Sequence, residues 1–124
     1  MASNKLEIFG PVALTTTLTT NIIAPAAAGA SAVGYTATAT YIILRHIRIV
    51  NKTAGAATFS LYKGATGGNV AGTEVIGTAL SVAANSAFDW YGALRLEGTN
   101  GFLVGGASAL TTLTFEAEGE LGLV

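Results

Sequence analysis

The sequence predicts an all-β protein, a single antiparallel β-sandwich or barrel, with an N-terminal arm or an added strand. Segments of alternating or β-branched residues recur along the chain, and turn-forming residues separate them at the spacing typical of sandwiches and barrels. No segment has the apolar periodicity of an amphipathic helix of normal length. A length of 124 residues suits one domain with its own core. We expect residues 35–124 to form the sandwich core, and residues 1–34 to form the N-terminal strand or arm with a flexible Ala/Gly-rich segment.

Two β segments are expected in the N-terminal part. Residues 5–9 form a short candidate strand, which Gly10 and Pro11 would end. Residues 12–23 are rich in threonine and other β-branched side chains, which favour strands. The small, apolar residues 25–34 lack the periodic stripe of an amphipathic helix and predict an ordered loop or an arm.

The densest β signal comes from two consecutive segments. Residues 41–50 are rich in β-branched and aromatic side chains, residues 57–63 alternate, and the turn-forming residues 51–56 lie between them. This arrangement predicts a β-hairpin. Strict alternation would place Arg45 and Arg48 on opposite faces of the first strand. Both faces are largely apolar, so we expect this strand to be central in the sandwich or partly covered by a neighbouring subunit.

Further strands are expected in the second half of the chain. They comprise residues 74–76, 79–82, 87–97, 102–104 and 112–120. Alternation in the strand at 87–97 directs Trp90 toward the core and Tyr91 toward the surface. The turn residues 98–101 predict a second hairpin. The last strand alternates most clearly, with Leu113, Phe115 and Ala117 on one face and Glu116, Glu118 and Glu120 on the other.

The composition favours assembly with other protein and argues against several partners. Only 10% of the residues are charged, compared with about 25% in an ordinary soluble domain. A monomer with so few charged residues would expose apolar surface patches, and such patches usually mark contacts with other protein. The net charge of −1 provides no basic field for nucleic acid. The chain has no cysteine, which excludes disulfides, zinc thiolate sites and cysteine nucleophiles. Its start has no long apolar run, so we expect synthesis in the cytoplasm without a signal peptide and no association with membrane.

No catalytic constellation emerges from the sequence, so we do not expect an enzyme, a cofactor or a metal site. His46 lies between two arginines without a recognisable group to orient its ring, which favours a structural or interface histidine over a general base. Arg45 and Arg48 are candidates for a subunit contact, where arginine is enriched. An intramolecular salt bridge to Asp89 or Glu97 is the alternative for these arginines.

The three glutamates of the last strand form a carboxylate row. Successive glutamates along this face would lie about 6.6 Å apart. A calcium ion, in contrast, needs six or more ligand oxygens at about 2.3–2.6 Å from the ion. A solvated or partner-facing acidic strip is therefore favoured over a metal site. The glycine-rich segment 67–73 has no lysine and no following helix, so it is not a phosphate-binding loop.

The motifs between residues 41 and 120 follow one another in a characteristic order. A strand ending in Asn51 and a small-residue loop lead to a Leu-Tyr strand, which ends near Lys63. A small-residue turn, an aromatic-Tyr-Gly strand and a final strand closing in a Gly-Glu pair follow. This pattern of turns and alternation resembles the small virion structural proteins of tailed phages. Residues before Tyr41 lie outside the resemblance.

The resemblance implies a jelly-roll-like or related sandwich that assembles on a phage particle. The expected function is that of a capsid decoration, or cement, protein on the capsid exterior, a homo-oligomer (dimer or trimer) whose partner is the major capsid protein. The N-terminal segment would be an arm that adds a strand to a neighbour. The candidate subunit or capsid contacts are Arg45, His46, Arg48, Tyr62 and Tyr91. The alternative is a tail or fibre module that binds a host receptor or glycan through exposed aromatic residues such as Tyr62 and Tyr91.

Overall fold

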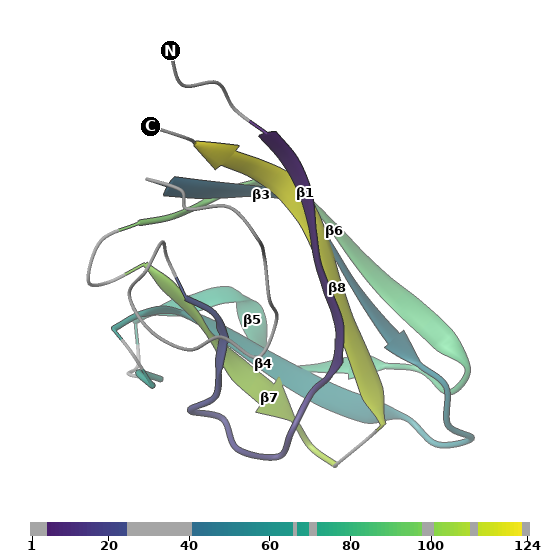
Figure 1. Ribbon diagram of the computed structural model, residues 1–124. Helices are drawn as coiled ribbons and strands as arrows, with labels where there is room; N and C mark the ends of the chain where they lie inside the picture. The colour runs from purple at the N-terminus through teal and green to yellow at the C-terminus, as the bar shows by residue number, and fades with distance from the viewer. Residues whose placement is uncertain are drawn as a thin grey trace.

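The computed structural model is a sandwich of two four-stranded antiparallel sheets (Figure 1). It describes residues 5–24, 41–65, 67–69, 72–97, 101–109 and 112–122. The strands are β1 (Lys5–Ala13), β2 (Asn21–Ile23), β3 (Tyr41–Asn51), β4 (Ala57–Gly64), β5 (Glu74–Val82), β6 (Ser86–Leu96), β7 (Phe102–Ala107) and β8 (Leu113–Gly122). Sheet A has the order β1-β8-β3-β6 and sheet B the order β2-β7-β4-β5. The predicted all-β sandwich is confirmed. Within the described residues, no helix is long and apolar enough to cross a membrane.

The chain passes from one sheet to the other at almost every connection. Only β4 and β5 are both consecutive in sequence and neighbours in one sheet. The predicted hairpin of residues 41–63 is therefore wrong, because β3 pairs with β6 and β8 while β4 pairs with β5 and β7. Both hydrogen-bonding edges of β3 are occupied, which leaves none for β4. Similarly, β6 and β7 belong to different sheets, so they form no hairpin; residues 98–100 of the predicted turn lie outside the described residues.

The buried side chain of Asn51 holds the crossing from β3 to β4. Its Nδ2 donates hydrogen bonds to the carbonyl oxygens of Gly55 (2.9 Å) and Val82 (3.0 Å). Its Oδ1 accepts from the backbone N–H of Thr53 (2.9 Å) and from the Thr53 hydroxyl (2.7 Å). Because Val82 ends β5 in sheet B, Asn51 both shapes the loop and ties the two sheets together.

The first strand is longer than the sequence predicts. β1 continues through Gly10 and Pro11 to Ala13, with a shift of register between Phe9 and Val12. The prediction that Gly10 and Pro11 end the strand is wrong because β1 is an edge strand, where a bulge accommodates a proline that cannot donate to a ladder. Gly10 has a φ of 97°, and an added Cβ would lie 2.9 Å from the Phe115 carbonyl oxygen.

The threonine-rich segment forms a strand only at its two ends. Residues 12–13 belong to β1 and residues 21–23 to β2, while the residues between them form a loop. The hydroxyls of Thr15 and Thr20 lie 2.9 Å apart, and the Thr20 hydroxyl donates to the Thr17 carbonyl oxygen (2.9 Å). Threonine side chains that bond to nearby groups compete with ladder hydrogen bonds, which explains the wrong prediction of a continuous strand.

The described part of the N-terminal segment belongs to the sandwich. β1 pairs with β8 in sheet A and β2 pairs with β7 in sheet B, so both strands belong to the sheets of their own chain. Residues 25–34, predicted as a loop or arm, lie outside the described residues. In the second half, the strands predicted at 74–76 and 79–82 form one irregular strand, β5, with positive φ at Ile76 and Ala79.

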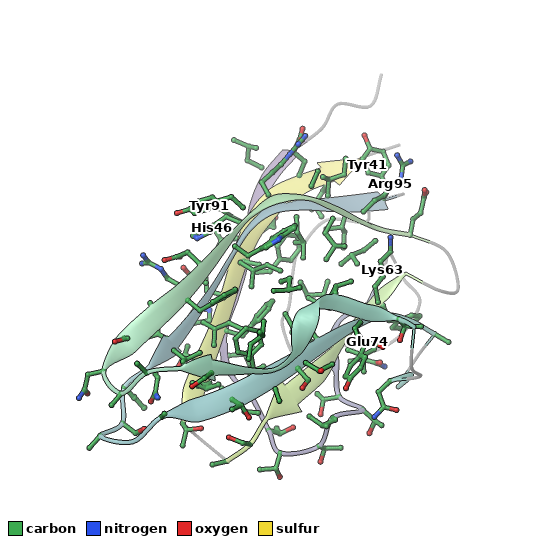
Figure 2. The ribbon with its side chains drawn as sticks, turned by 180° about the vertical axis from the view of Figure 1, so that it is seen from behind. Tyr41, His46, Lys63, Glu74, Tyr91 and Arg95 are labelled. Atoms are coloured by element: carbon green, nitrogen blue, oxygen red, sulfur yellow. The ribbon has the colours of Figure 1, made fainter. Side chains whose placement is uncertain are left out.

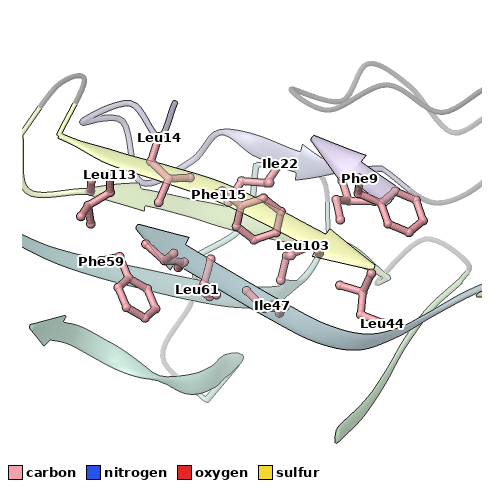
Figure 3. Packing of buried hydrophobic residues seen from close by; sticks show 14 of the residues in the cluster. Phe9, Leu14, Ile22, Leu44, Ile47, Phe59, Leu61, Leu103, Leu113 and Phe115 are labelled. Atoms are coloured by element: carbon pink, nitrogen blue, oxygen red, sulfur yellow. The ribbon is translucent and has the colours of Figure 1, made fainter. Parts of the chain in front are cut away.

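The core lies between the two sheets (Figure 3). Fully buried members at 0–1% exposure include Phe9, Ile22, Ile47, Phe59, Leu61, Leu103 and Phe115. The alternation predicted for the last strand is confirmed, since Phe115 is buried while Glu116 and Glu118 are exposed. Trp90 is partly buried and packs against the core, as predicted.

Candidate functional site

The outer face of sheet A, which points away from sheet B, carries most of the predicted contact residues. The register of β3 against both neighbouring strands shifts between Leu44 and His46. Leu44 and Ile47 are both buried, so Arg45 and His46 between them both lie on the outer face. The prediction that Arg45 and Arg48 lie on opposite faces is wrong, because the bulge adds one residue and inverts the alternation after it.

Rows of side chains cross this outer face from strand to strand. One row consists of Ile8 on β1, Glu118 on β8, His46 on β3 and Tyr91 on β6, which are register partners in turn. In an adjacent row, Arg48 lies between Glu116 and Asp89. Figure 2 shows His46 and Tyr91 projecting from the same side of the sheet. The face therefore has an acidic column on β8 beside a basic column on β3.

Both arginines of β3 form ion pairs within the chain. Arg48 Nε lies 2.9 Å from Asp89 Oδ1, which confirms the salt bridge to Asp89 that we considered as the alternative. Arg45 Nη2 lies 2.7 Å from Glu120 Oε2. Sequence reasoning missed this second pair because strict alternation placed Arg45 on the other face. Both guanidinium side chains remain about half exposed, at 53% for Arg45 and 50% for Arg48.

His46 is held between two carboxylates and an aromatic ring. Its Nε2 lies 2.6 Å from Asp89 Oδ1, and its Nδ1 lies 3.4 Å from Glu118 Oε1. Its ring stacks on Tyr91 with centroids 4.5 Å apart and an interplanar angle of 6°. These contacts orient the imidazole and the Tyr91 ring together on the face.

The contacts among Arg48, His46 and Asp89 shift the pKa values of Asp89 and Arg48. The hydrogen bond from Arg48, followed by that from His46, holds the pKa of Asp89 below its ordinary value of 3.8. The same hydrogen bond to Asp89 raises the pKa of Arg48 above its ordinary value. A carboxylate with a lowered pKa stabilises the fold above its unfolded-state pKa, and this contribution is lost as the pH falls through the folded-state value.

We therefore expect the stability difference between the wild-type chain and an Asp89→Asn variant to depend on pH. The variant should be less stable than the wild type well above pH 3.8, and the difference should shrink as the pH falls below that value. Urea unfolding of both chains, followed by circular dichroism over this pH range, measures the difference. A difference that stays constant through acid pH would contradict the assignment of Asp89 as the anchoring carboxylate.

Exposed apolar side chains flank the charged columns. Leu6 is 81% exposed, Ile8 59% and Tyr91 72%. Leu6 and Ile8 line a pocket of about 540 Å³ together with Glu7, Arg45, Glu118 and Gly119. Sequence reasoning missed Leu6 and Ile8, although the period of two already placed them on one face and Phe9 on the other. Tyr91 is exposed as predicted.

Tyr62 does not belong to this face. It is 9% exposed and lies in a small cluster with Ala24, Phe102 and Val104. Its strand, β4, is in sheet B between β7 and β5. The structure thus brings together Arg45, His46, Arg48 and Tyr91 and places Tyr62 elsewhere.

The arrangement on the outer face suits binding to a protein surface. Its charged groups form pairs and rows, and its exposed apolar groups lie at the edges of those rows. Among the described residues, no group of three or more His, Asp or Glu side chains could hold a metal ion. The chain matches no protein-family model, and no curated protein matches it in sequence.

Proposed function

We propose that this chain is a non-enzymatic structural protein of a tailed-phage virion, a homo-oligomer that binds the capsid lattice as a decoration protein. The observation that carries the proposal is the outer face of sheet A, where Leu6, Ile8 and Tyr91 are more than half exposed on a sandwich with few charges. Exposed apolar side chains that share one face indicate contact with other protein. The resemblance of residues 41–120 to small phage virion proteins supports the virion setting.

The strand order supports a jelly-roll winding of the sandwich. β1 pairs with β8, β2 with β7, β3 with β6 and β4 with β5, so the chain resembles one long hairpin wrapped around the core. Two four-stranded sheets built in this way are the arrangement of jelly rolls, which occur in viral capsid domains. That link is an analogy of fold and carries less weight than the exposed face.

A decoration protein would stabilise the shell by mass action. A protein that binds only the assembled lattice stabilises it by about 2.7 kcal/mol per site when its concentration is a hundred times the Kd. Because a lattice offers many equivalent sites, a modest contact at each site is sufficient to stabilise the shell. Receptor binding by a tail or fibre module is less well supported, because Tyr62 is buried and lies apart from Tyr91.

The copy number of this chain in purified phage particles tests the proposal. Quantitative mass spectrometry would give its ratio to the major capsid protein. We expect a ratio of order one, as for a protein that covers the lattice. A handful of copies per particle would instead indicate a tail or portal protein, and absence from particles would contradict the virion assignment. Addition of the purified chain to undecorated shells should also raise their thermal disruption temperature.

A further inference from the structure

The charged columns of the outer face of sheet A are complementary to each other. Glu116 and Glu118 on β8 lie beside Arg48 and His46 on β3 as register partners. Ile8 extends one of these rows on the β1 side and Tyr91 extends it on the β6 side. Read across the sheet, this row is apolar, acidic, basic and aromatic. Read in reverse, it is aromatic, basic, acidic and apolar, so each member meets a suitable partner when the row is laid over its own reversed copy.

We propose that the outer face of sheet A packs against the same face of a second copy of this chain. The two-fold axis would run parallel to the strands, in the plane between the two faces, midway between β8 and β3. Such a rotation exchanges the columns. Glu118 of one copy then faces His46 of the other, and Glu116 faces Arg48. Contacts of this kind are isologous, because residue i meets residue j and residue j meets residue i.

The charge pattern selects this axis over the other face-to-face arrangement. A two-fold axis across the strands would lay β8 over β8 and β3 over β3. Carboxylates would then face carboxylates and bases would face bases, which is unfavourable for close charges. With the axis along the strands, each carboxylate keeps its neighbour in its own chain and gains a base from the second copy.

The apolar flanks fit the same arrangement. The exchange places Tyr91 of each copy over Ile8 of the other, at the edge of the pocket of about 540 Å³ that Leu6, Ile8 and Gly119 help to line. Tyr91 is 72% exposed and is held by its stack on His46, so it projects as a pre-oriented side chain. Aromatic residues that enter an apolar pocket commonly dominate the energetics of protein interfaces.

The flat area of the face lies somewhat below that of a standard interface. Four strands about 4.8 Å apart, with about nine residues each at about 3.3 Å per residue, cover an area of about 19 Å by 30 Å. The accessible surface of the projecting side chains exceeds this flat footprint. The accessible area of the face therefore approaches the roughly 800 Å² that each partner buries in a standard interface. A single sheet face can supply the whole contact.

This inference gives the homo-oligomer of the proposed function a specific interface, and it does not depend on binding to a shell. The dimer is a property of the purified chain, whereas decoration requires a shell. A dimer without virion copies would contradict only the virion proposal, whereas virion copies of a monomeric chain would contradict the dimer and the homo-oligomeric state but not the virion location.

Sedimentation velocity of the purified full chain over a range of concentrations tests the dimer. We expect a dimer for the wild type and an increase of about tenfold or more in the dimer Kd for Glu116→Lys, since two symmetric contacts become repulsive. Arg48→Glu should have the same effect. Lys52→Glu, on the exposed loop after β3, reverses a charge away from the face and should leave the Kd unchanged.

Mixing the two charge-reversed chains gives the sharpest test. Each variant alone would be repelled by its own copy, but in the mixed pair Lys at 116 meets Glu at 48, and the native Arg48 meets the native Glu116. We expect the mixture to dimerise more tightly than either variant alone. Repulsion within each chain persists in the mixture, so a rescue would come from the contacts between chains. Circular dichroism verifies that both variants are folded.

Cross-linking tests the orientation of the two copies. The chain has no cysteine, so Ile8→Cys and Tyr91→Cys each introduce a single thiol. In the proposed dimer, position 8 of one copy lies opposite position 91 of the other, while like positions are separated by about 14 Å across the sheet in addition to the spacing between the faces. A short bismaleimide should join the two variants when they are mixed and neither variant to itself.

Two outcomes would overturn the inference. The first is a monomer at all concentrations; loss of shell binding by Glu116→Lys in that monomer would show that the face binds the capsid protein instead. The second is a dimer whose Kd is unchanged by Glu116→Lys and Ile8→Ser, because the contact would then lie on another surface.

Discussion

Replacement of Phe115 by alanine is expected to lower the free energy of unfolding by about 3–5 kcal/mol, the usual cost of deleting a buried phenylalanine ring. Phe115 is 0% exposed and lies on β8 between β1 and β3, with its ring directed into the space between the sheets (Figure 3). Its removal loses the transfer free energy of the ring and leaves a cavity that a two-sheet core cannot close. A domain of this size has about 5–15 kcal/mol of stability in total. Urea denaturation followed by circular dichroism measures the loss.

A matched variant separates this core effect from the general effect of shortening an apolar side chain. Leu18 lies in the loop before β2 and is 36% exposed. Leu18→Ala should cost about 1 kcal/mol or less, because Leu18 is about one-third exposed and lies outside the core cluster. A cost for Phe115→Ala no larger than that for Leu18→Ala would place Phe115 outside the core.

Replacement of Asn51 by alanine is expected to cost about 2–4 kcal/mol, since it removes four hydrogen bonds of about 1 kcal/mol each at a buried site. The carbonyl oxygens of Gly55 and Val82 and the N–H of Thr53 would lose their bonds to this side chain. Asn51→Asp keeps the acceptor toward Thr53 but replaces the donor with an oxygen that faces the two carbonyl oxygens. We expect this variant to be at least as unstable as Asn51→Ala at neutral pH. Chemical denaturation of both variants measures these losses.

Ser86 provides the control for this prediction. Its hydroxyl also bonds to a backbone carbonyl oxygen, that of Ala84 at 3.1 Å, but the residue is exposed. Ser86→Ala should change the stability by about 0.5 kcal/mol or less, because water replaces the lost partner. Equal effects of Asn51→Ala and Ser86→Ala would mean that Asn51 does not hold the crossing between the sheets.

The two proposals together would account for the exposed apolar side chains on the outer face of sheet A. A monomer would leave Leu6, Ile8 and Tyr91 in water, whereas the face-to-face dimer would bury them against a second copy. The remaining surface, including sheet B and the loops, would then be available to a shell.

The sequence alone was sufficient to predict the strands and the direction of many of their side chains. The alternation of β8 correctly separated Phe115 from Glu116, and that of β6 separated Trp90 from Tyr91. These predictions succeed because the period of two is a local property of an extended backbone. The exposed face was partly predictable as well, since Arg45, His46, Arg48 and Tyr91 were all candidate contact residues.

Strand pairing and the composition of that face were decided only by the tertiary structure. Sequence proximity favoured a hairpin of residues 41–63, but β6 and β8 occupy both edges of β3, and this competition between distant segments is invisible in a local pattern. One bulge between Leu44 and His46 inverts the alternation, so Arg45 joins Arg48 on the outer face. Tyr62 is buried by packing with Phe102 and Val104, about forty residues further along the chain. Local patterns determine where strands form, whereas long-range pairing and packing determine which strands meet and which side chains reach the surface.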